Sequence, residues 1–434
     1  MKKNALFILT LFLAALMLPA GCKKNDSPAA PQPAGTATDS PTITKTRTAT
    51  LTYTISPTNS NTRTITPTFT ITQTHTVSPT ATITPTQMPY PPKLFGWDNY
   101  PVIYAVKEIS SGGYILAGST GPGVLHVKID ADGDCVWASS YNTYFGASSR
   151  DIIEIPGGDF VAAGEWRESG SYEGTSIMRV SGVDGSRVWQ KSFGSYWLSQ
   201  DRGLGIAATA DGGYVIAGDS DDYDGNMLLY KTNSVGDPLW AKSFGEQLYG
   251  DWGEAVIQES DMGYVIAGTS WNYGSWGPNM YMVRTDSSGN STWAKYYEGT
   301  GYGNDMIKVA DGYIIAGSSS TYVACLLKAD FDGDCVWART WGSNASLRAV
   351  RQTPDGGYIT AGDNGPGVYI CRTDAAGNIA WEKNIWADIT AGYSRAYDIE
   401  ITSDNGFIIA GDTSQFGSWK GFAIKTDANG NQVW

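Results

Sequence analysis

The residues that could carry out chemistry are mostly acidic, and they recur at matching places along the chain. Two runs, Asp130-Ala131-Asp132-Gly133-Asp134 and Asp330-Phe331-Asp332-Gly333-Asp334, place carboxylates at alternate positions, as calcium-binding loops do. A calcium loop also needs a more distant Glu ligand, and other copies of the segment read Ser-Ser-Gly-Asn or Ala-Ala-Gly-Asn. We therefore predict tight turns here and no metal site.

A second acidic set could line a channel, cap loops or hydrolyse glycosides. It consists of Asp151, Asp201, Asp251, Asp305 and Asp398. Two carboxylates can cleave a glycosidic bond, but nothing in the sequence selects one pair from this set. Only His75 and His126 could supply an imidazole, His126 is expected to be a packed core residue, and no nucleophile motif or phosphate loop is visible. We predict no catalytic residues and no cofactor, with a carbohydrate-active enzyme (glycosidase or lyase) as the alternative.

Cysteine and charge limit the function further. Cys135 and Cys335 occupy equivalent places in two copies of a repeat, Cys325 is out of register with Cys335, and Cys371 is alone. We expect these four to be small buried residues without disulfides. The formal net charge of −13 opposes nucleic-acid binding, which needs a basic surface.

The elements that must position these side chains come from a repeat that fills residues 93–434. An Ala-Gly step recurs seven times, ending at Gly118, Gly164, Gly218, Gly268, Gly317, Gly362 and Gly411. A Trp follows each step, at Trp137, Trp189, Trp240, Trp293, Trp337, Trp381 and Trp434. A period of about 49 residues with short apolar segments and Gly-rich turns predicts a seven-bladed β-propeller, all-β, with four strands in each blade. We expect the repeated Trp side chains to fill the wedges between blades.

One copy defines the blade. Strands are predicted at 203–210, at 214–218 after an Asp-Gly-Gly turn, at 227–232, and at a final strand that contains Trp240 and ends at Gly245. The last copy stops at Trp434, and the missing end of its outer strand, Lys93-Leu94-Phe95-Gly96, stands at the start of the repeats. The N-terminal piece is therefore expected to complete the seventh blade.

The repeat resembles exported bacterial β-propeller repeats of the Gly-Asn-x-x-Trp-x-x-x-x-Gly and Asp-Gly-Gly-Tyr-x-x-x-Gly type. It is also distantly similar to the PQQ-like quinoprotein blade, whose Trp docks neighbouring blades. The first resemblance implies a surface or periplasmic protein without known catalysis. Quinoproteins usually have eight blades, a calcium site and an adjacent-Cys disulfide, so no quinone is expected here.

The first 21 residues read as a signal peptide, with Lys2 and Lys3 before an apolar run too short for a comfortable membrane span. The run ends Leu18-Pro19-Ala20-Gly21-Cys22, which resembles the lipobox of bacterial lipoproteins although the Leu stands one residue early. This resemblance implies lipidation of Cys22, with ordinary cleavage nearby as the alternative. Residues 22–92 alternate Thr with Pro interruptions, which predicts a disordered, polyproline-II-rich tether, open to O-glycosylation.

Function is expected on the face that carries the variable loops, between the second and third strands and between successive blades. Its aromatic residues are the ligand-binding candidates: Trp166, Tyr196, Trp197, Tyr249, Trp252, Trp271, Tyr273, Trp276, Trp386 and Trp419, with Tyr172 and Tyr393 in the same loops. Aromatic faces beside Asp and Asn suit sugar rings and protein partners alike, and the same side chains could simply pack the loops.

The sequence therefore predicts a non-catalytic binding module for a protein, peptide or glycan. The propeller is expected to be monomeric, exported and held at the bacterial cell envelope by an N-terminal lipid, periplasmic or on the surface. A purely structural envelope component is the other alternative.

Overall fold

A computed structural model of the chain describes residues 44–56, 64–76, 92–96, 100–121, 123–142, 146–169, 172–194, 201–220, 225–245, 250–272, 277–365, 367–386, 392–416 and 418–434. Every regular element in these residues is a β-strand. Within them, no helix is long and apolar enough to cross a membrane. Residues 90–434 and residues 23–89 belong to two separate compact units.

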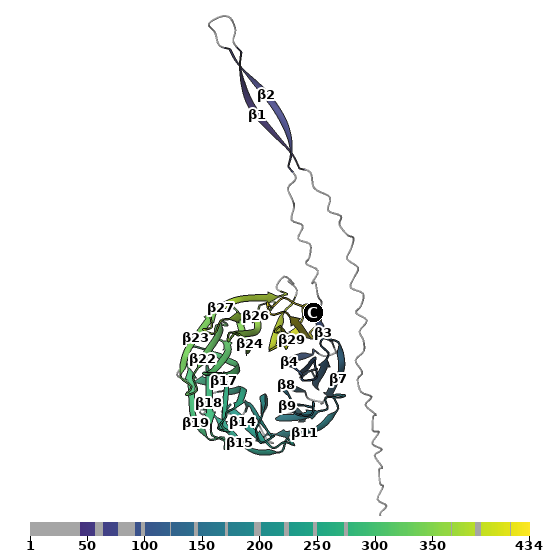
Figure 1. Cartoon of the computed structure of the whole chain (residues 1–434), viewed down its shortest axis with the longest axis vertical. Coiled ribbons are helices and arrows are strands. Elements are labelled where there is room, and N and C mark those ends of the chain that lie inside the picture. Colours follow the sequence, from purple (N-terminus) through teal and green to yellow (C-terminus); the bar gives the residue numbers. More distant parts are fainter. Residues whose placement is uncertain are drawn as a thin grey trace, which may run out of the picture. The chain divides into compact units, whose positions relative to one another are not determined.

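Residues 90–434 form seven four-stranded antiparallel sheets arranged as a β-propeller (Figure 1). Blade one consists of β4 (Val102–Glu108), β5 (Tyr114–Ser119), β6 (Gly123–Ile129) and β7 (Cys135–Asn142). Blade two consists of β8 (Ala147–Glu154), β9 (Phe160–Ser169), β10 (Tyr172–Val180) and β11 (Arg187–Phe193). Blade three consists of β12 (Arg202–Ala208), β13 (Tyr214–Asp219), β14 (Met227–Thr232) and β15 (Pro238–Phe244). Blade four consists of β16 (Asp251–Gln258), β17 (Tyr264–Asn272), β18 (Gly277–Thr285) and β19 (Ser291–Tyr297).

The remaining blades repeat this order. Blade five consists of β20 (Tyr302–Val309), β21 (Gly312–Ser318), β22 (Ala324–Ala329) and β23 (Cys335–Trp341). Blade six consists of β24 (Ala345–Gln352), β25 (Tyr358–Asn364), β26 (Gly367–Thr373) and β27 (Ile379–Ile385). Blade seven consists of β28 (Ser394–Ile401), β29 (Phe407–Thr413), β30 (Lys420–Thr426) and β3 (Lys93–Phe95). The predicted seven-bladed, four-stranded architecture is confirmed.

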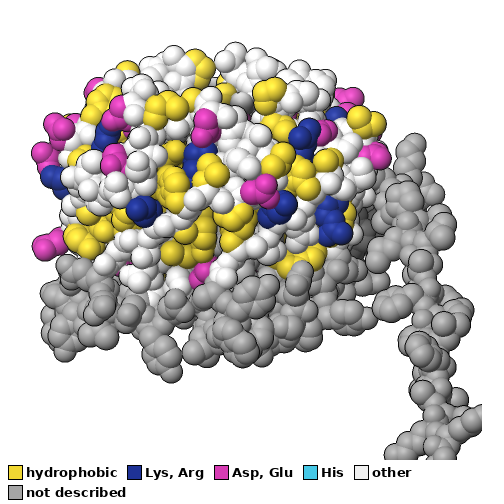
Figure 2. Space-filling model, turned by 90° about the horizontal axis from the view of Figure 1, so that it is seen from below, with side chains coloured by type: hydrophobic (Ala, Val, Ile, Leu, Met, Phe, Trp, Pro, Cys, Tyr) yellow, Lys and Arg dark blue, Asp and Glu magenta, His cyan; other side chains and the backbone are white. Residues whose placement is uncertain are grey.

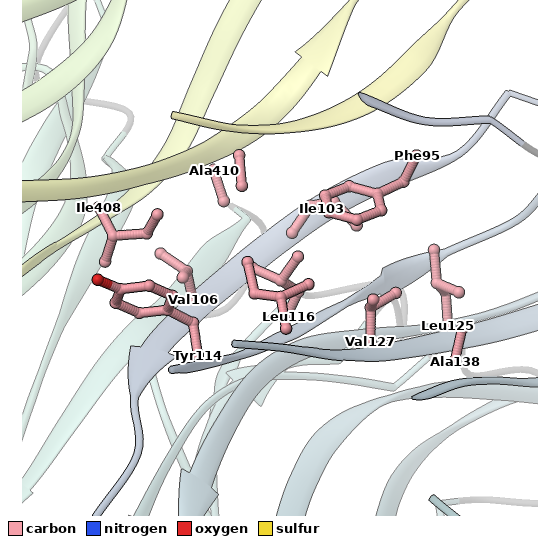
Figure 3. Packing of buried hydrophobic residues seen from close by; sticks show 12 residues of the cluster. Phe95, Ile103, Val106, Tyr114, Leu116, Leu125, Val127, Ala138, Ile408 and Ala410 are labelled. Atoms are coloured by element: carbon pink, nitrogen blue, oxygen red, sulfur yellow. The ribbon is translucent and has the colours of Figure 1, made fainter. Parts of the chain in front are cut away.

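The N-terminal piece closes the ring, as predicted. Leu94 of β3 pairs with Phe422 of β30, and at the other end of β30 Thr426 forms a bridge with Gln432. The outer strand of blade seven is therefore assembled from both ends of the propeller sequence. Phe95 packs in one cluster with Ile103 of blade one and with Ile408 of blade seven, so the closure is also a hydrophobic contact (Figure 3).

The repeated Trp side chains lie between blades, as predicted. The Trp137 ring lies 6.3 Å from the Phe160 ring of the next blade, and a Cβ on Gly185 would come 2.5 Å from Trp137. Each Trp thus packs under the turn glycine of the following blade. The pairs are Trp137–Gly185, Trp189–Gly236, Trp240–Gly289, Trp293–Gly333, Trp337–Gly377, Trp381–Gly430 and Trp434–Gly133. Only glycine leaves room for the indole at these turns, whose positive φ angles also favour it.

The outer wall mixes hydrophobic, acidic and basic side chains (Figure 2). Lys295, two residues after a repeated Trp, binds Asp334 of the next blade with Nζ 2.8 Å from Oδ1. Lys93 of blade seven makes the same contact with Asp134 of blade one, also at 2.8 Å. Such exposed pairs contribute little individually, so the wedges rather than the outer wall hold neighbouring blades together.

The two Asp-rich runs are turns, as predicted. Asp130 Oδ1 accepts hydrogen bonds from the backbone N–H groups of Asp132 and Asp134, at 3.0 and 2.8 Å, while Gly133 has a φ of 77°. The carboxylate therefore closes its own turn. Asp330 makes the same two bonds in blade five.

The prediction for His126 is confirmed, whereas that for the cysteines is wrong in part. His126 is fully buried, with Nε2 2.8 Å from Ser149 Oγ. Cys325 and Cys371 are buried free thiols, but Cys335 is exposed, and Cys135 is disulfide-bonded. The register argument covered only pairs among the four repeat cysteines.

The other unit contains one antiparallel pair, β1 (Thr44–Ser56) with β2 (Thr64–Thr76). The expected polyproline-II conformation therefore does not hold for these two segments, where alternating Thr favours strand pairing. Pro67 fits because it stands opposite Tyr53 in a two-stranded ribbon, where one side of each strand needs no partner. Such a ribbon is marginally stable alone in water, which is compatible with a linker. The signal peptide and Cys22 lie outside the described residues.

Candidate functional site

Two hollows mark the propeller as a binding scaffold. The first, here called the central cavity, has a volume of about 500 Å³ and is lined by the innermost strand of every blade. The second, here called the loop-face hollow, has a volume of about 410 Å³ and lies over blades five to seven. Both have volumes in the range of small-molecule sites.

A β-bulge in each innermost strand lines the central cavity with one ring of side chains. In blade four the pairing shifts between Gly253 and Ala255, so Glu254 has no partner residue in the sheet. All seven innermost strands have this shift at the same place. The seven bulged residues all line the cavity, and they are Tyr104, Arg150, Leu204, Glu254, Asn304, Arg348 and Tyr397.

Sequence reasoning missed this ring. Its signal was a position that varies in size and charge between mostly small neighbours, as in Gly203-Leu204-Gly205 beside Gly253-Glu254-Ala255. A residue that varies between small neighbours in otherwise matching strands has no repeated packing role. Variation there could therefore have indicated exposure to a cavity.

Three of the repeated Asp residues line the central cavity beside the seven bulged residues, which fits the expectation that they line a channel. Asp151, Asp305 and Asp398 each accept a hydrogen bond from a backbone N–H of the next blade, at 2.9 to 3.0 Å. Burial raises the pKa of Asp151 and of Asp305. Asp201 and Asp251 are instead buried at the starts of their blades, where Asp201 accepts a bond from the Tyr230 hydroxyl.

The cavity end farther from the loop face is held by a charge cluster across blades five, six, seven and one. Arg351 lies 2.7 Å from both Asp305 and Asp398 and 3.2 Å from Glu400, and Lys107 lies 3.1 Å from Asp398. Burial opposes ionisation of Asp398, but Lys107 and Arg351 outweigh it and lower its pKa. Asp398 therefore stays ionised and paired, which suits a structural role better than proton transfer.

The cavity end nearer the loop face, here called the channel mouth, presents guanidinium groups held from behind by acids. Arg150 pairs with Glu165 at 3.0 Å, and Arg348 with Asp363 at 2.7 Å. Arg202 makes a bidentate pair with Asp219, whose side chain is 3% exposed against 36% for Arg202. In that pair the carboxylate is hidden and the guanidinium faces the cavity, so the Arg is preorganised for an anion.

Glu254 is the exception in the channel mouth. Among the described residues no hydrogen bond or ion pair reaches its carboxylate. Burial raises its pKa to about 7 and Asp219 adds to the increase, while Arg150, Arg202 and Arg348 act against it. This side chain therefore changes charge near neutral pH.

The loop-face hollow combines exposed aromatic rings with an anchored Arg. Tyr322 and Tyr393 are 60% and 65% exposed, and Trp419 lies with its ring 5.1 Å from the Arg395 guanidinium. Arg395 in turn makes a bidentate pair with buried Asp412, at 3.0 and 2.6 Å. The aromatic surface is therefore open, and its cation is held in place.

Two of the six non-Gly residues with positive φ among the described residues line this hollow. Tyr322 and Asn344 both line it and both have positive φ angles, 56° and 59°. The Ala345 N–H donates to the Tyr322 carbonyl at 2.8 Å, which links the two strained loops. The left-handed backbone conformation is energetically unfavourable for an aromatic residue, so the loop that presents the Tyr322 ring is strained.

The described aromatic candidates fall in different places. Trp419 lines the loop-face hollow, and Trp252 lines the central cavity. Trp271 is 40% exposed at the end of β17, whereas Trp166 is half-buried against the blade-two core. Trp386 is buried against Phe416 and Phe422, which makes it a packing residue. Tyr196, Trp197, Tyr249, Tyr273 and Trp276 lie outside the described residues, as does the Tyr172 side chain.

The chain resembles known proteins in fold only. No protein-family model matches it, and no curated protein matches its sequence. A protein of unknown function from Bacteroides caccae aligns with 60% of this chain and 88% of its own, at 13% identity and a TM-score of 0.42. The Neurospora crassa Pan2 WD40 domain aligns with 74% of this chain and 88% of its own, at 12% identity and a TM-score of 0.48.

Proposed function

We propose that the protein is an exported envelope lipoprotein that displays its propeller as a non-catalytic binding module. The observation that carries the proposal is the loop-face hollow, where strained backbone holds exposed Tyr322 beside Tyr393 and Trp419. Open aromatic surface on a rigid scaffold is typical of ligand recognition. A β-propeller is also a fold that commonly serves protein interaction.

The ligand class follows from the chemistry of the hollow. Aromatic rings accept the C–H face of a sugar or an apolar side chain, and Arg395 with Asp363 supplies a donor and an acceptor beside them. Both a glycan and a peptide segment fit this combination.

A non-catalytic role is favoured by the pairing of the three repeated Asp side chains that line the central cavity. In the described part of the central cavity, Asp305 and Asp398 are ion-paired with Arg351, and Asp151 accepts backbone hydrogen bonds. A glycosidase needs one carboxylic acid and one carboxylate that flank the scissile bond. Reducing sugar released from any polysaccharide by the purified chain would contradict this part of the proposal.

The test of binding is an array of glycans and envelope proteins probed with the full chain. A triple variant, Tyr322→Ala with Tyr393→Ala and Trp419→Ala, removes the aromatic surface of the hollow. Phe331→Ala is the control, because it removes an exposed aromatic ring from the Asp330–Asp334 turn, away from the hollow and from the aromatic candidates. We expect the triple variant to lose the specific signal and the control to keep it. Equal signals from both variants would refute the hollow as the contact surface.

The envelope anchor has its own test. Mass spectrometry of the mature N-terminal peptide is expected to show acyl and diacylglyceryl groups on Cys22. A peptide in which Cys22 is joined to Cys135 would refute lipidation, because a thiol in a disulfide cannot also carry a thioether lipid.

A further inference from the structure

We propose that the channel mouth is a second binding site, selective for a carboxylate-bearing sugar. Its carboxylate would lie among Arg150, Arg202 and Arg348, and its ring against Trp252. The proposal concerns a different cavity from the loop-face hollow, although Asp363, which pairs with Arg348, also lines the hollow.

The charge at the mouth is the first argument. The three guanidinium groups come from blades two, three and six, and all three act on the pKa of Glu254, so their fields meet in the cavity. The protein as a whole has a net charge of −13. Because each guanidinium is paired with an acid, the mouth offers an anion a set of fixed N–H donors rather than an excess of positive charge.

The arrangement of the pairs is the second argument. Each guanidinium uses part of its donor set on one acid, namely Glu165, Asp219 or Asp363, and all three side chains are partly exposed. Arg has five N–H donors, so each retains donors for a ligand. The Arg150 guanidinium also lies 4.1 Å from the Tyr104 ring centroid, which limits its movement. Positions fixed before binding reduce the entropy that a ligand must offset.

The aromatic surface is the third argument, and it separates a sugar from a bare anion. Tyr104 is covered by Arg150, and Tyr397 lies under Arg348 at 5.0 Å. Trp252 lines the same cavity and has no such cation in the described residues. Trp252 is half-buried, so part of its surface is open for the C–H face of a sugar ring, and a cavity of about 500 Å³ has room for one.

Glu254 adds a pH dependence to this site. It faces Arg150 on β8, Arg202 on β12, Asp219 on β13 and Arg348 on β24, and its pKa is about 7. Ionised Glu254 would repel a bound carboxylate and compete for the guanidinium groups, whereas the protonated form can donate a hydrogen bond to it. Binding should therefore be tight below pH 7 and weaker above it.

Calorimetric titration of the full chain with glucuronate tests the proposal, with glucose as the neutral ring and acetate as the carboxylate without a ring. Glucuronate is expected to bind at least tenfold more tightly than either. If only the protonated Glu254 form binds, affinity should fall about tenfold from pH 6 to pH 8, in proportion to that fraction. Glu254→Gln, which cannot ionise, should bind equally at both values of pH.

The matched variants separate this site from the hollow. The double change Arg202→Gln with Asp219→Asn removes one guanidinium without leaving its buried partner charged, and it should lower glucuronate affinity at least tenfold. Tyr393→Ala, in the loop-face hollow, should leave that affinity unchanged. The proposal is overturned if glucose or acetate binds as well as glucuronate, if the double variant binds normally, or if Glu254→Gln keeps the pH dependence of the parent. None of these three outcomes would affect the separate proposal that the loop-face hollow binds a ligand on the glycan and protein array.

Discussion

Closure of the ring by the N-terminal piece makes a quantitative prediction for Phe95→Ala. Phe95 is 8% exposed and joins a cluster made of blade-one and blade-seven residues. Truncation of a buried Phe to Ala costs about 3–5 kcal/mol. Unfolding entropy of roughly 2.1 cal/mol/K per residue over some 340 residues converts this cost into a decrease in Tm of about 4–7 °C.

Differential scanning calorimetry of the full chain measures this shift. Val136→Ala is the first control, because Val136 lies on the outer strand β7 and is 53% exposed. Lys93→Ala is the second, because it removes partly exposed contacts only, the pair with Asp134 and a cation–π contact with Trp434, each worth about 1 kcal/mol or less. If Phe95→Ala lowers the Tm no more than either control does, the closure argument is refuted, because the outer strand at Phe95 would then not be needed for stability.

Two further predictions concern the core. Gly333→Ala should lower the free energy of unfolding by at least 1 kcal/mol more than Gly356→Ala. Both glycines have a positive φ, so the backbone cost of Ala is shared. They differ in space, because a Cβ on Gly333 would lie 2.9 Å from the Trp293 ring whereas a Cβ on Gly356 meets nothing within 4 Å. Equal denaturant midpoints for the two variants would contradict the wedge role of the turn glycine. Burial lowers the pKa of His126 to about 3, so only the unfolded chain takes up its proton between pH 6.5 and 3, and stability is lost as pH falls through that range. The free energy of unfolding should be about 2 kcal/mol lower at pH 5 than at pH 7.5, at 1.4 kcal/mol per pH unit. His126→Gln should remove this pH-dependent loss. If the stability difference between parent and variant is the same at both pH values, the prediction is wrong.

The blade could be predicted because its determinants are local and repeated. The strand at 227–232 was predicted with the bounds that β14 has, because an apolar run ends at Thr232 before a turn with Gly236 at positive φ. Seven copies in step then left few alternatives to a propeller. The ring closure followed from the same repeat, because the last copy lacks the piece that Lys93 to Phe95 supply.

The binding surfaces were only partly predictable. Trp419 and Trp252 were among the aromatic candidates, but their sequence contexts did not separate them from Trp386, which packs against Phe422 in the core. A Trp in a long loop can turn inward or outward, and that choice depends on neighbours contributed by other blades. The exposure of Tyr322 likewise depends on backbone strain that no residue type announces.

The sequence by itself determined the strands, the turns, the number of blades and the means of closure, because each follows from residues within one repeat or at its ends. Only the tertiary structure decided which side chains meet in the central cavity. Arg150, Arg202, Glu254 and Arg348 lie on four different blades and line one cavity only because the ring closes. The β-bulges turn Arg150, Glu254 and Arg348 inward, whereas Arg202 stands at the start of β12, two residues before its bulge. The chemistry of this protein therefore depends on positions far apart in the chain, and local sequence patterns do not record their convergence.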